Sequence, residues 1–268
     1  LNLMGDLFHE ATSFDDIDKV MAMVAMTARH RYLVLTKRPA RMAEYFNEHL
    51  TNPVDQLADA AFAAFGDPND CHVANAINGC LADGHNVGWP MSNLWVGTSV
   101  EDQTTADERI PHLLKAQAVL RFVSVEPMLQ EILIRSQYML GYSRSADKTP
   151  IRCNKLDWVI VGGEAGANAR PMDPDWVRSL RDQCKAAGVP FMFKQWGEWA
   201  PGEIPFRSSK DNASFYRWVS DSKIVAFKTS PRRYSFDCDD PYSGHVCAWR
   251  VGKKAAGRKL DGATHLAF

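Results

Sequence analysis

A short apolar run that ends in two glycines and a carboxylate is the feature that most constrains the fold of this chain. Residues Trp158 to Val161 are all apolar, and a Gly-Gly-Glu sequence follows them at residues 162–164. A run of this length is typical of a strand buried on both faces, as in a parallel sheet. Two glycines allow a backbone or a ligand to approach closely where the strand ends. Alone, the pattern favours a plain strand with a tight turn over a binding site.

The same pattern of an apolar strand followed by polar residues recurs along the chain. The strands that we expect are residues 1–4, 32–35, 94–96, 119–125, 158–161 and 190–193. Helical patterns lie between most of them, and this alternation predicts βα units with a parallel sheet. The polar residues at the strand ends are Asp6, Thr36, Lys37, Arg38, Thr98, Ser99, Glu101, Glu126, Glu164, Lys194 and Gln195. Because the carboxyl ends of parallel strands open onto one face, we expect one shared polar cleft; the alternative is that these residues begin separate exposed loops.

Capping patterns define the boundaries of two helices. Ser13, with Asp16 three residues later, is a capping box at the start of a helix. Asp173 and Gly188 are a typical N-cap and C-cap of a second helix. Apolar residues at helical spacing give each helix one buried stripe, and we therefore expect Cys184 to be an inert thiol in the core.

The remaining stretches are less regular. A helical pattern at about residues 105–116 contains Pro111, which we expect to kink the helix or split it. Residues 138–155 are polar and predict an irregular surface loop. Residues 52–90 interrupt the alternation and predict a helical insertion. After residue 201, short antiparallel strands are expected at residues 215–219, 224–228, 232–236 and 246–251.

Composition argues against several classes of protein. The chain has 268 residues and a formal net charge of −1, so no global basic field indicates nucleic-acid binding. No stretch approaches the roughly 20 apolar residues of a membrane helix, and we expect no membrane partner. The cysteines are scattered, which suits the reducing cytoplasm, where we place the protein. Cys71, His72, Cys80 and His85 match no common zinc spacing.

Two patterns near the C-terminus leave alternatives open. Residues 252–259 read Gly-Lys-Lys-Ala-Ala-Gly-Arg-Lys, which is either a solvated tail or a phosphate contact. Several aromatic residues lie among the arginines at positions 207, 217, 232 and 233: Trp196, Trp199, Phe215, Tyr216, Trp218 and Tyr234. This mixture suits base stacking with phosphate contact, or the aromatic residues form the small core of an appendage.

Several motifs together resemble one known family. They are GDLFHE (5–10), LTKRPARM (35–42), LWVGTSVEDQ (94–103), RFVSVEPM (121–128), DWVIVGGEAG (157–166), RPMDPDWVRSLRDQC (170–184) and FKQWGEW (193–199). In these motifs the chain resembles the uncharacterised phage gene product thirty-seven/sixty-eight family, found in bacteriophages and bacterial genomes. The resemblance covers most of the chain outside residues 52–90, 138–155 and 204–246.

This resemblance implies a fold and two cofactors. Members of the family resemble radical S-adenosylmethionine enzymes, in which three closely spaced cysteines follow the first strand of a partial TIM-like barrel. Those thiolates hold a [4Fe–4S] cluster whose open iron position binds S-adenosylmethionine. The cofactor-binding residues that the resemblance implies here are Asp6, Thr36, Thr98, Ser99, Glu101, Gly162, Gly163 and Gln195.

This sequence departs from the family pattern because it contains no three-cysteine cluster. We therefore expect no iron–sulfur cluster in this chain, which is either truncated or a degenerate member. The fold class that we expect is α/β, a partial TIM-like (β/α) barrel of parallel strands that lacks its N-terminal unit. Residues 1–203 form this barrel with the helical insertion at about 52–90, and residues 204–268 form a β appendage with the basic tail.

Three functions remain open. The first is a radical S-adenosylmethionine-like enzyme, which the resemblance and the polar strand ends suggest; phage context and the basic tail suggest nucleic acid or nucleotide as its substrate. The second is a non-catalytic module that binds nucleic acid or a protein. The third is a metal-independent acid–base enzyme. The catalytic residues that we expect are Lys37, Glu126, Glu164 and Lys194.

Overall fold

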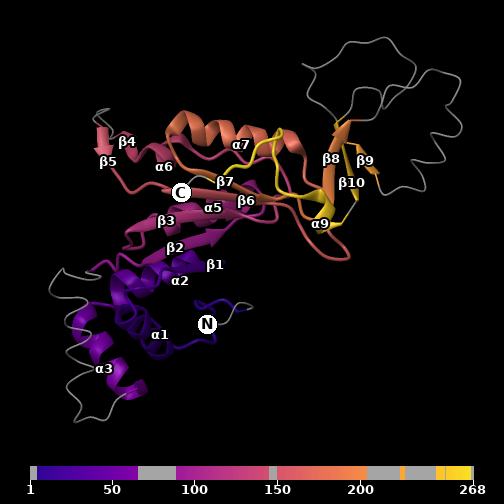
Figure 1. Ribbon diagram of the computed structural model, residues 1–268. Coiled ribbons are helices and arrows are strands. Elements are labelled where there is room, and N and C mark those ends of the chain that lie inside the picture. Colours follow the sequence, from indigo (N-terminus) through magenta and orange to yellow (C-terminus); the bar gives the residue numbers. More distant parts are fainter. Residues whose placement is uncertain are drawn as a thin grey trace, which may run out of the picture. The chain divides into compact units, whose positions relative to one another are not determined.

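The computed structural model describes residues 5–65, 89–144, 150–203, 224–226, 246–250 and 252–266 (Figure 1). The chain divides into two compact units. Unit 1 contains Leu1–Val100, Thr104–Ser124 and Arg135–Val159, and unit 2 contains Glu101–Gln103, Val125–Ile134 and Ile160–Phe268. The boundary expected at residue 203 stays a prediction.

A five-stranded parallel sheet, flanked by helices, is the main element of the fold (Figure 1). Its strands are β1 (Tyr32–Thr36), β2 (Leu94–Ser99), β3 (Leu120–Val125), β6 (Trp158–Gly162) and β7 (Phe191–Gln195), hydrogen-bonded in the order β1-β2-β3-β6-β7. Tyr32 pairs with Leu94 and Trp95 with Leu120 in parallel register. Every residue of β6 is buried, as the apolar run predicts. The parallel α/β sheet is therefore confirmed, while the described strands show an open sheet and no barrel; the strand expected at residues 1–4 lies outside the described residues.

The first helix of unit 1, α1 (Phe14–Met26), begins as its capping box predicts. The Ser13 Oγ accepts a hydrogen bond from the Asp16 amide at 3.1 Å. Ile17 and Met21 are fully buried on its apolar stripe. Local sequence therefore determines both where this helix starts and which face it buries.

A buried carboxylate on α1 was not expected from the sequence. Helix α2 (Pro39–Glu44) continues into a π-helix, η1 (Tyr45–His49), and α3 (Pro53–Phe65) follows. The Tyr45 hydroxyl donates to the Asp18 carboxylate at 2.6 Å, and His49 Nε2 lies 2.9 Å from the same carboxylate. Burial, followed by these contacts with Asp18, raises the pKa of Tyr45. The network joins α1 to η1 inside the core of unit 1.

The central part of the chain differs from the predictions at two places. Helix α5 (Gln103–Leu113) runs through Pro111 without being split, and Ile110 and Leu113 are buried on either side of the proline; a kink at Pro111 stays a prediction. The stretch expected to be an irregular loop, residues 138–155, contains regular secondary structure. It contains the end of α6 (Ser136–Leu140) and an antiparallel pair, β4 (Tyr142–Arg144) and β5 (Pro150–Arg152). Strands of three residues are too short to show a periodic pattern in the sequence.

The helix of unit 2, α7 (Pro174–Ala187), has the boundaries that its caps predict. The Asp173 carboxylate accepts a hydrogen bond from the Asp175 amide at 2.8 Å, and Gly188 takes the left-handed conformation that ends the helix. Val177 and Cys184 are fully buried. Burial raises the pKa of the Cys184 thiol to about 12, which suits the inert thiol that we expected.

Antiparallel strands and a C-terminal segment complete unit 2. Strands β8 (Trp199–Glu203), β9 (Ile224–Ala226) and β10 (Val246–Arg250) form a three-stranded sheet in the order β8-β10-β9. The strands expected at residues 215–219 and 232–236 lie outside the described residues. After the short helix α9 (Lys253–Ala256), the chain reaches the outer strand of the parallel sheet, where Met192 pairs with Leu266 and the Phe193 amide donates to the His265 carbonyl at 3.0 Å. None of the described helices is long and apolar enough to cross a membrane.

The cap of α7 gives a test of these boundaries. We expect Asp173→Ala to lower the free energy of unfolding by about 1 kcal/mol, because the amide of Asp175 loses its acceptor. Asp173→Asn should keep most of this stability, since asparagine caps helices as well as aspartate. Urea denaturation of the three proteins measures both effects, and an equal loss in the two variants would contradict a capping role.

Candidate functional site

Three polar side chains meet at the carboxyl ends of strands in unit 2, and we call Glu126, Lys194 and Gln195 the strand-end cluster. Glu126 follows β3, and the other two residues end β7. The Lys194 ammonium lies 2.9 Å from one oxygen of the Glu126 carboxylate, and the Gln195 amide donates to the other oxygen at 3.2 Å. The Lys194 side chain is 50% exposed and that of Glu126 is 21% exposed, so the ion pair faces solvent on one side.

Gly162 makes room for this cluster. A Cβ atom at Gly162 would lie 3.0 Å from the Glu126 carboxyl carbon, closer than ordinary van der Waals contact. In the strand order, β6 lies between β3 and β7. The Glu126 side chain therefore passes over a position without a side chain to reach Lys194.

Gly163 and Gly197 let the backbones after β6 and β7 pack against each other. A Cβ atom at Gly163 would overlap the Trp196 carbonyl, and one at Gly197 would overlap the Glu164 carbonyl. Two hydrogen bonds flank this reciprocal contact: the Gly163 amide donates to the Gln195 carbonyl at 2.9 Å, and the Glu198 amide to the Glu164 carbonyl at 3.0 Å. The close approach that the two glycines predict is thus made by backbone.

Glu164 is held by an arginine that the sequence analysis did not select. Both Glu164 oxygens accept hydrogen bonds at 2.8 Å from the Arg170 guanidinium, and the Arg170 amide donates to one of them at 2.7 Å. These hydrogen bonds lower the pKa of Glu164 against a smaller, opposite effect of burial. A carboxylate engaged in this way is suited to fixing the loop after β6, and less suited to taking up a proton. No spacing rule links Glu164 to a residue six positions later in a loop.

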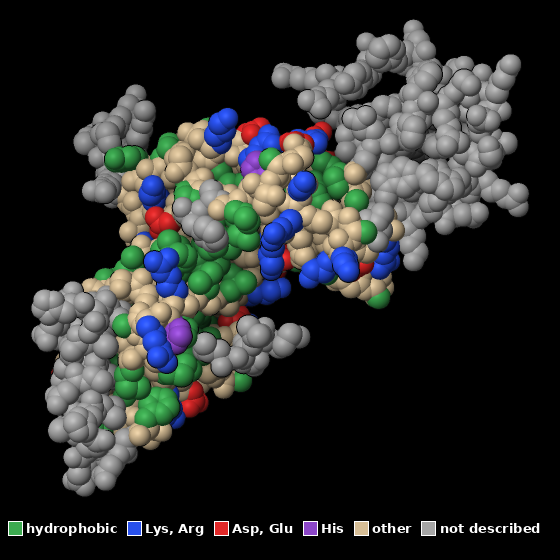
Figure 2. Space-filling view, viewed as in Figure 1, with side chains coloured by type: hydrophobic (Ala, Val, Ile, Leu, Met, Phe, Trp, Pro, Cys, Tyr) green, Lys and Arg blue, Asp and Glu red, His purple; other side chains and the backbone are tan. Residues whose placement is uncertain are grey.

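The basic segment, residues 252–259, is anchored to the loop after β7. The Trp196 amide donates to the Gly257 carbonyl at 3.1 Å, and the Gly252 amide donates to the Glu198 carbonyl at 3.0 Å. The Trp196 indole N–H donates to the Lys259 carbonyl at 2.8 Å. The exposed cationic side chains of this segment are Lys253, Lys254, Arg258 and Lys259. Lysine and arginine side chains gather around α9 in Figure 2. Because of the hydrogen bonds to Trp196 and Glu198, the backbone of this segment is not a free tail.

A separate group of the expected residues lies in unit 1. The Asp6 carboxylate accepts hydrogen bonds from the Thr36 hydroxyl at 2.6 Å, from the Lys37 amide at 2.9 Å and from the Arg38 guanidinium at 3.1 Å. Burial raises the pKa of Asp6, but these hydrogen bonds and one from the Phe8 amide outweigh it, and the net pKa is lowered. The Thr98 hydroxyl donates to the Thr36 carbonyl at 2.9 Å. Asp6 therefore ties the N-terminal turn to the end of β1.

The structure thus brings part of the expected residues together in each unit, while Glu164, Ser99 and Glu101 have other partners. Ser99 is buried in unit 1, where its carbonyl accepts a hydrogen bond from Arg109 at 2.8 Å. The Glu101 carbonyl in unit 2 accepts one from the Leu129 amide at 2.9 Å. A single cleft shared by all of these residues, and their catalytic and cofactor-binding roles, stay predictions.

The cysteines that the structure describes as free thiols do not form a ligand set for iron. Cys153 is exposed in unit 1 and Cys184 is buried in α7. No group of three His, Cys, Asp or Glu residues among the described residues is arranged to hold a metal ion. The described residues therefore supply no set of three neighbouring thiolates of the kind that a [4Fe–4S] cluster needs. Cys71, His72, Cys80 and His85, whose spacing matches no common zinc pattern, lie outside the described residues.

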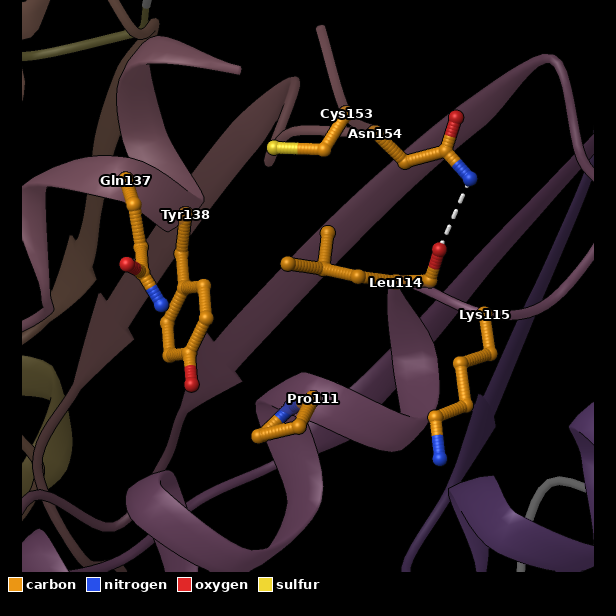
Figure 3. A pocket seen from close by; sticks show the side chains of 7 residues that line it. All are labelled: Pro111, Leu114, Lys115, Gln137, Tyr138, Cys153 and Asn154. Atoms are coloured by element: carbon orange, nitrogen blue, oxygen red, sulfur yellow. Dashed lines mark hydrogen bonds between the residues drawn. The ribbon is translucent and has the colours of Figure 1, made fainter. Parts of the chain in front are cut away.

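Unit 1 contains a cavity of about 720 Å³ that is lined by none of the expected catalytic or cofactor-binding residues (Figure 3). Pro111, Leu114 and the ring of Tyr138 supply apolar lining, and Cys153 lies at its border. The side-chain amide of Asn154, which also lines the cavity, donates a hydrogen bond to the Leu114 carbonyl at 2.8 Å. The cavity lies beside the stretch that precedes β3, away from the carboxyl end of that strand.

Comparison with protein families gives one match over residues 1–268, to the model described as "Protein of unknown function (DUF5131)". The chain belongs to this family. No curated protein and no solved structure matches the chain. For this DUF5131 protein, the arrangement of the side chains therefore carries the functional argument.

The two glycines after β6 predict different responses to the same substitution in the DUF5131 protein. Gly163→Ala should lower the free energy of unfolding by about 3 kcal/mol or more, because the new methyl group overlaps backbone that cannot move away. Gly162→Ala meets only the Glu126 side chain and should cost roughly 1 kcal/mol. Chemical denaturation compares them, and a larger loss in Gly162→Ala would contradict the packing described here.

The Glu164–Arg170 pair predicts a pH-dependent stability difference. Because the folded-state pKa of Glu164 is lowered, the pair stabilises the DUF5131 protein fully above the unfolded pKa of about 4.3, and this stabilisation is lost as pH falls through the folded pKa. Glu164→Gln should therefore melt below the wild type at pH 7 and approach it near pH 3. Melting temperatures across this range test the expectation; a constant difference would contradict it.

Proposed function

We propose that this DUF5131 protein binds a nucleic acid or a nucleotide at the carboxyl ends of β6 and β7. The observation that carries the proposal is the anchoring of the basic segment to the loop that follows β7, with the Trp196 amide 3.1 Å from the Gly257 carbonyl. Lys253, Lys254, Arg258 and Lys259 are exposed, and their segment is thereby anchored to the loop that directly follows the strand-end cluster in the chain. Phosphate groups are the ligands that such a local concentration of cations favours, even when the net charge of the chain is near zero.

The strand-end cluster supplies the polar contacts of the proposed site. Lys194 is held by Glu126 on one side and is half exposed on the other, where a phosphate oxygen can contact its ammonium. The Glu126 carboxylate is an acceptor for a ribose hydroxyl, and the second N–H of the Gln195 amide is a donor for a base edge. A phosphate, a sugar and a base can thus each find a partner.

The lineage that we propose is that of cytoplasmic phage or prophage proteins related to radical S-adenosylmethionine enzymes, with part of a (β/α) barrel. The strand order supports this proposal, because consecutive strands of the parallel sheet are neighbours and only the β4–β5 pair intervenes in the chain. A doubly wound sheet would reverse its order at a switch point. In a barrel, ligands bind at the carboxyl ends of the strands.

The sequence leaves open whether the protein modifies a nucleic acid or only binds it. The side chains described above support binding. The sequence contains six cysteines, and no three of them are closely spaced. Among the described residues, no three thiolates are neighbours, as binding of a [4Fe–4S] cluster would need. The binding alternative therefore takes precedence over the modifying enzyme.

Two substitutions in the strand-end cluster test this proposal, one that removes a positive charge and one that removes a negative charge. Lys194→Ala should weaken binding of a labelled oligonucleotide or a nucleoside triphosphate by about fivefold to tenfold, since one charge-assisted contact contributes about 1 kcal/mol. Glu126→Gln should strengthen it, because a negative charge is removed next to the phosphate.

Fluorescence anisotropy and calorimetry at low salt measure both effects, with Lys185→Ala, an exposed lysine in the last turn of α7, as the control. The proposal is overturned if the wild type binds neither probe, or if the two cluster variants change the affinity in the same direction.

A further inference from the structure

We propose that the basic segment binds the phosphate backbone of double-stranded nucleic acid. This inference rests on the proposed function and specifies its ligand. It depends on how the segment is held, on the state of its charges, and on the burial of the aromatic residues beside it.

The backbone of the segment is fixed at both of its ends. The Gly252 amide donates to the Glu198 carbonyl at 3.0 Å at the first end. At the second end, the Trp196 indole N–H donates to the Lys259 carbonyl at 2.8 Å. Cations on a fixed backbone lose less conformational entropy when they contact phosphates than cations on a free tail do. The positions of Lys253 and Lys254 relative to Lys259 are thus set before a ligand arrives.

The charges of the segment are available to a ligand. Within the part of the chain that the structure describes, Lys253, Lys254, Arg258 and Lys259 form no ion pair. The carboxylate nearest to them in sequence, Asp261, is instead paired with Arg178 at 2.8 Å and with Arg181 at 2.7 Å on α7. These two arginines lower the pKa of Asp261 against the opposite effect of burial, so it stays ionised and engaged. Helix α7 therefore engages the carboxylate that lies nearest to the segment in sequence.

Of the aromatic residues expected to stack on bases, the two that the structure describes are not exposed for stacking; Phe215, Tyr216, Trp218 and Tyr234 lie outside the described residues. Trp196 is 3% exposed and Trp199 is 8% exposed. Their indole N–H groups donate to the Lys259 and Ala169 carbonyls, each at 2.8 Å. Binding of single strands without sequence preference relies on exposed aromatic rings on which unpaired bases stack. A duplex keeps its bases stacked inside and presents its phosphates, which is the chemistry that this surface offers.

Salt dependence of binding tests the assignment. Fluorescence anisotropy is measured with a labelled duplex of about 20 base pairs and with a single strand of the same length, as DNA and as RNA. The variants are Lys253→Gln with Lys254→Gln, and Arg258→Gln with Lys259→Gln, with Lys185→Gln as the control. Glutamine keeps a long polar side chain, and all of these side chains are exposed, so each variant should melt as the wild type does.

We expect the wild type to bind duplex more tightly than single strand. Each double variant should weaken duplex binding at least tenfold and lower the slope of log Kd against log salt by about 2, because each phosphate that a cation no longer neutralises reduces the slope by roughly 0.9. Lys185→Gln should change neither quantity.

The outcomes separate the two proposals. If the wild type binds no nucleic acid or nucleotide, the proposed function fails and this inference fails with it. If the wild type binds single strands more tightly than duplexes, or if both double variants keep the affinity and salt slope of the wild type, only this inference is overturned. If one double variant fails to fold, the other pair decides the result.

Discussion

The fold of unit 2 depends on a contact between two backbones. Beyond the ends of β6 and β7, Gly163 lies against the Trp196 carbonyl and Gly197 against the Glu164 carbonyl, with no room for a side chain at either glycine. Hydrogen bonds on both sides of this contact keep the two loops in register. The basic segment is hydrogen-bonded to the loop after β7, so this contact also fixes the segment relative to the end of β7. This packing positions the polar groups of the site together with the hydrogen bonds that Lys194 and Gln195 donate to Glu126.

Local rules in the sequence were sufficient for much of the fold. The apolar run at residues 158–161, the capping box at Ser13 and the caps of α7 each involve residues close in the chain, and the structure confirms all of them. The differences have another origin. Helix α5 is not split at Pro111, and Ile110 and Leu113 on either side of it are buried, which a rule about proline alone does not include. Tertiary contacts decide such positions.

The site was predictable in its residues and not in their partners. Glu126 and Lys194 were selected because they follow strands, and the structure places their charged groups 2.9 Å apart. The sequence does not show that Gly162 lets the carboxylate cross a strand, or that Arg170 engages Glu164. Both facts depend on which segments become neighbours in space, and a single sequence carries no direct record of that. For the same reason, the sequence left two interpretations of the basic segment open, a solvated tail or a phosphate contact. Its anchoring by Trp196 is a tertiary contact.

The pairing of Met192 with Leu266 has a consequence for how the protein is made. A sheet edge with free amides and carbonyls is a template to which other chains can add. Here the segment that occupies the outer side of β7 is separated from it by more than seventy residues of sequence. During synthesis from the N-terminus, β7 leaves the ribosome well before that segment does. The outer edge of β7 is therefore unpaired in the nascent chain until the segment around Leu266 has been made. A chaperone that binds this edge would prevent aggregation during that interval, and slow translation after residue 195 would lengthen it.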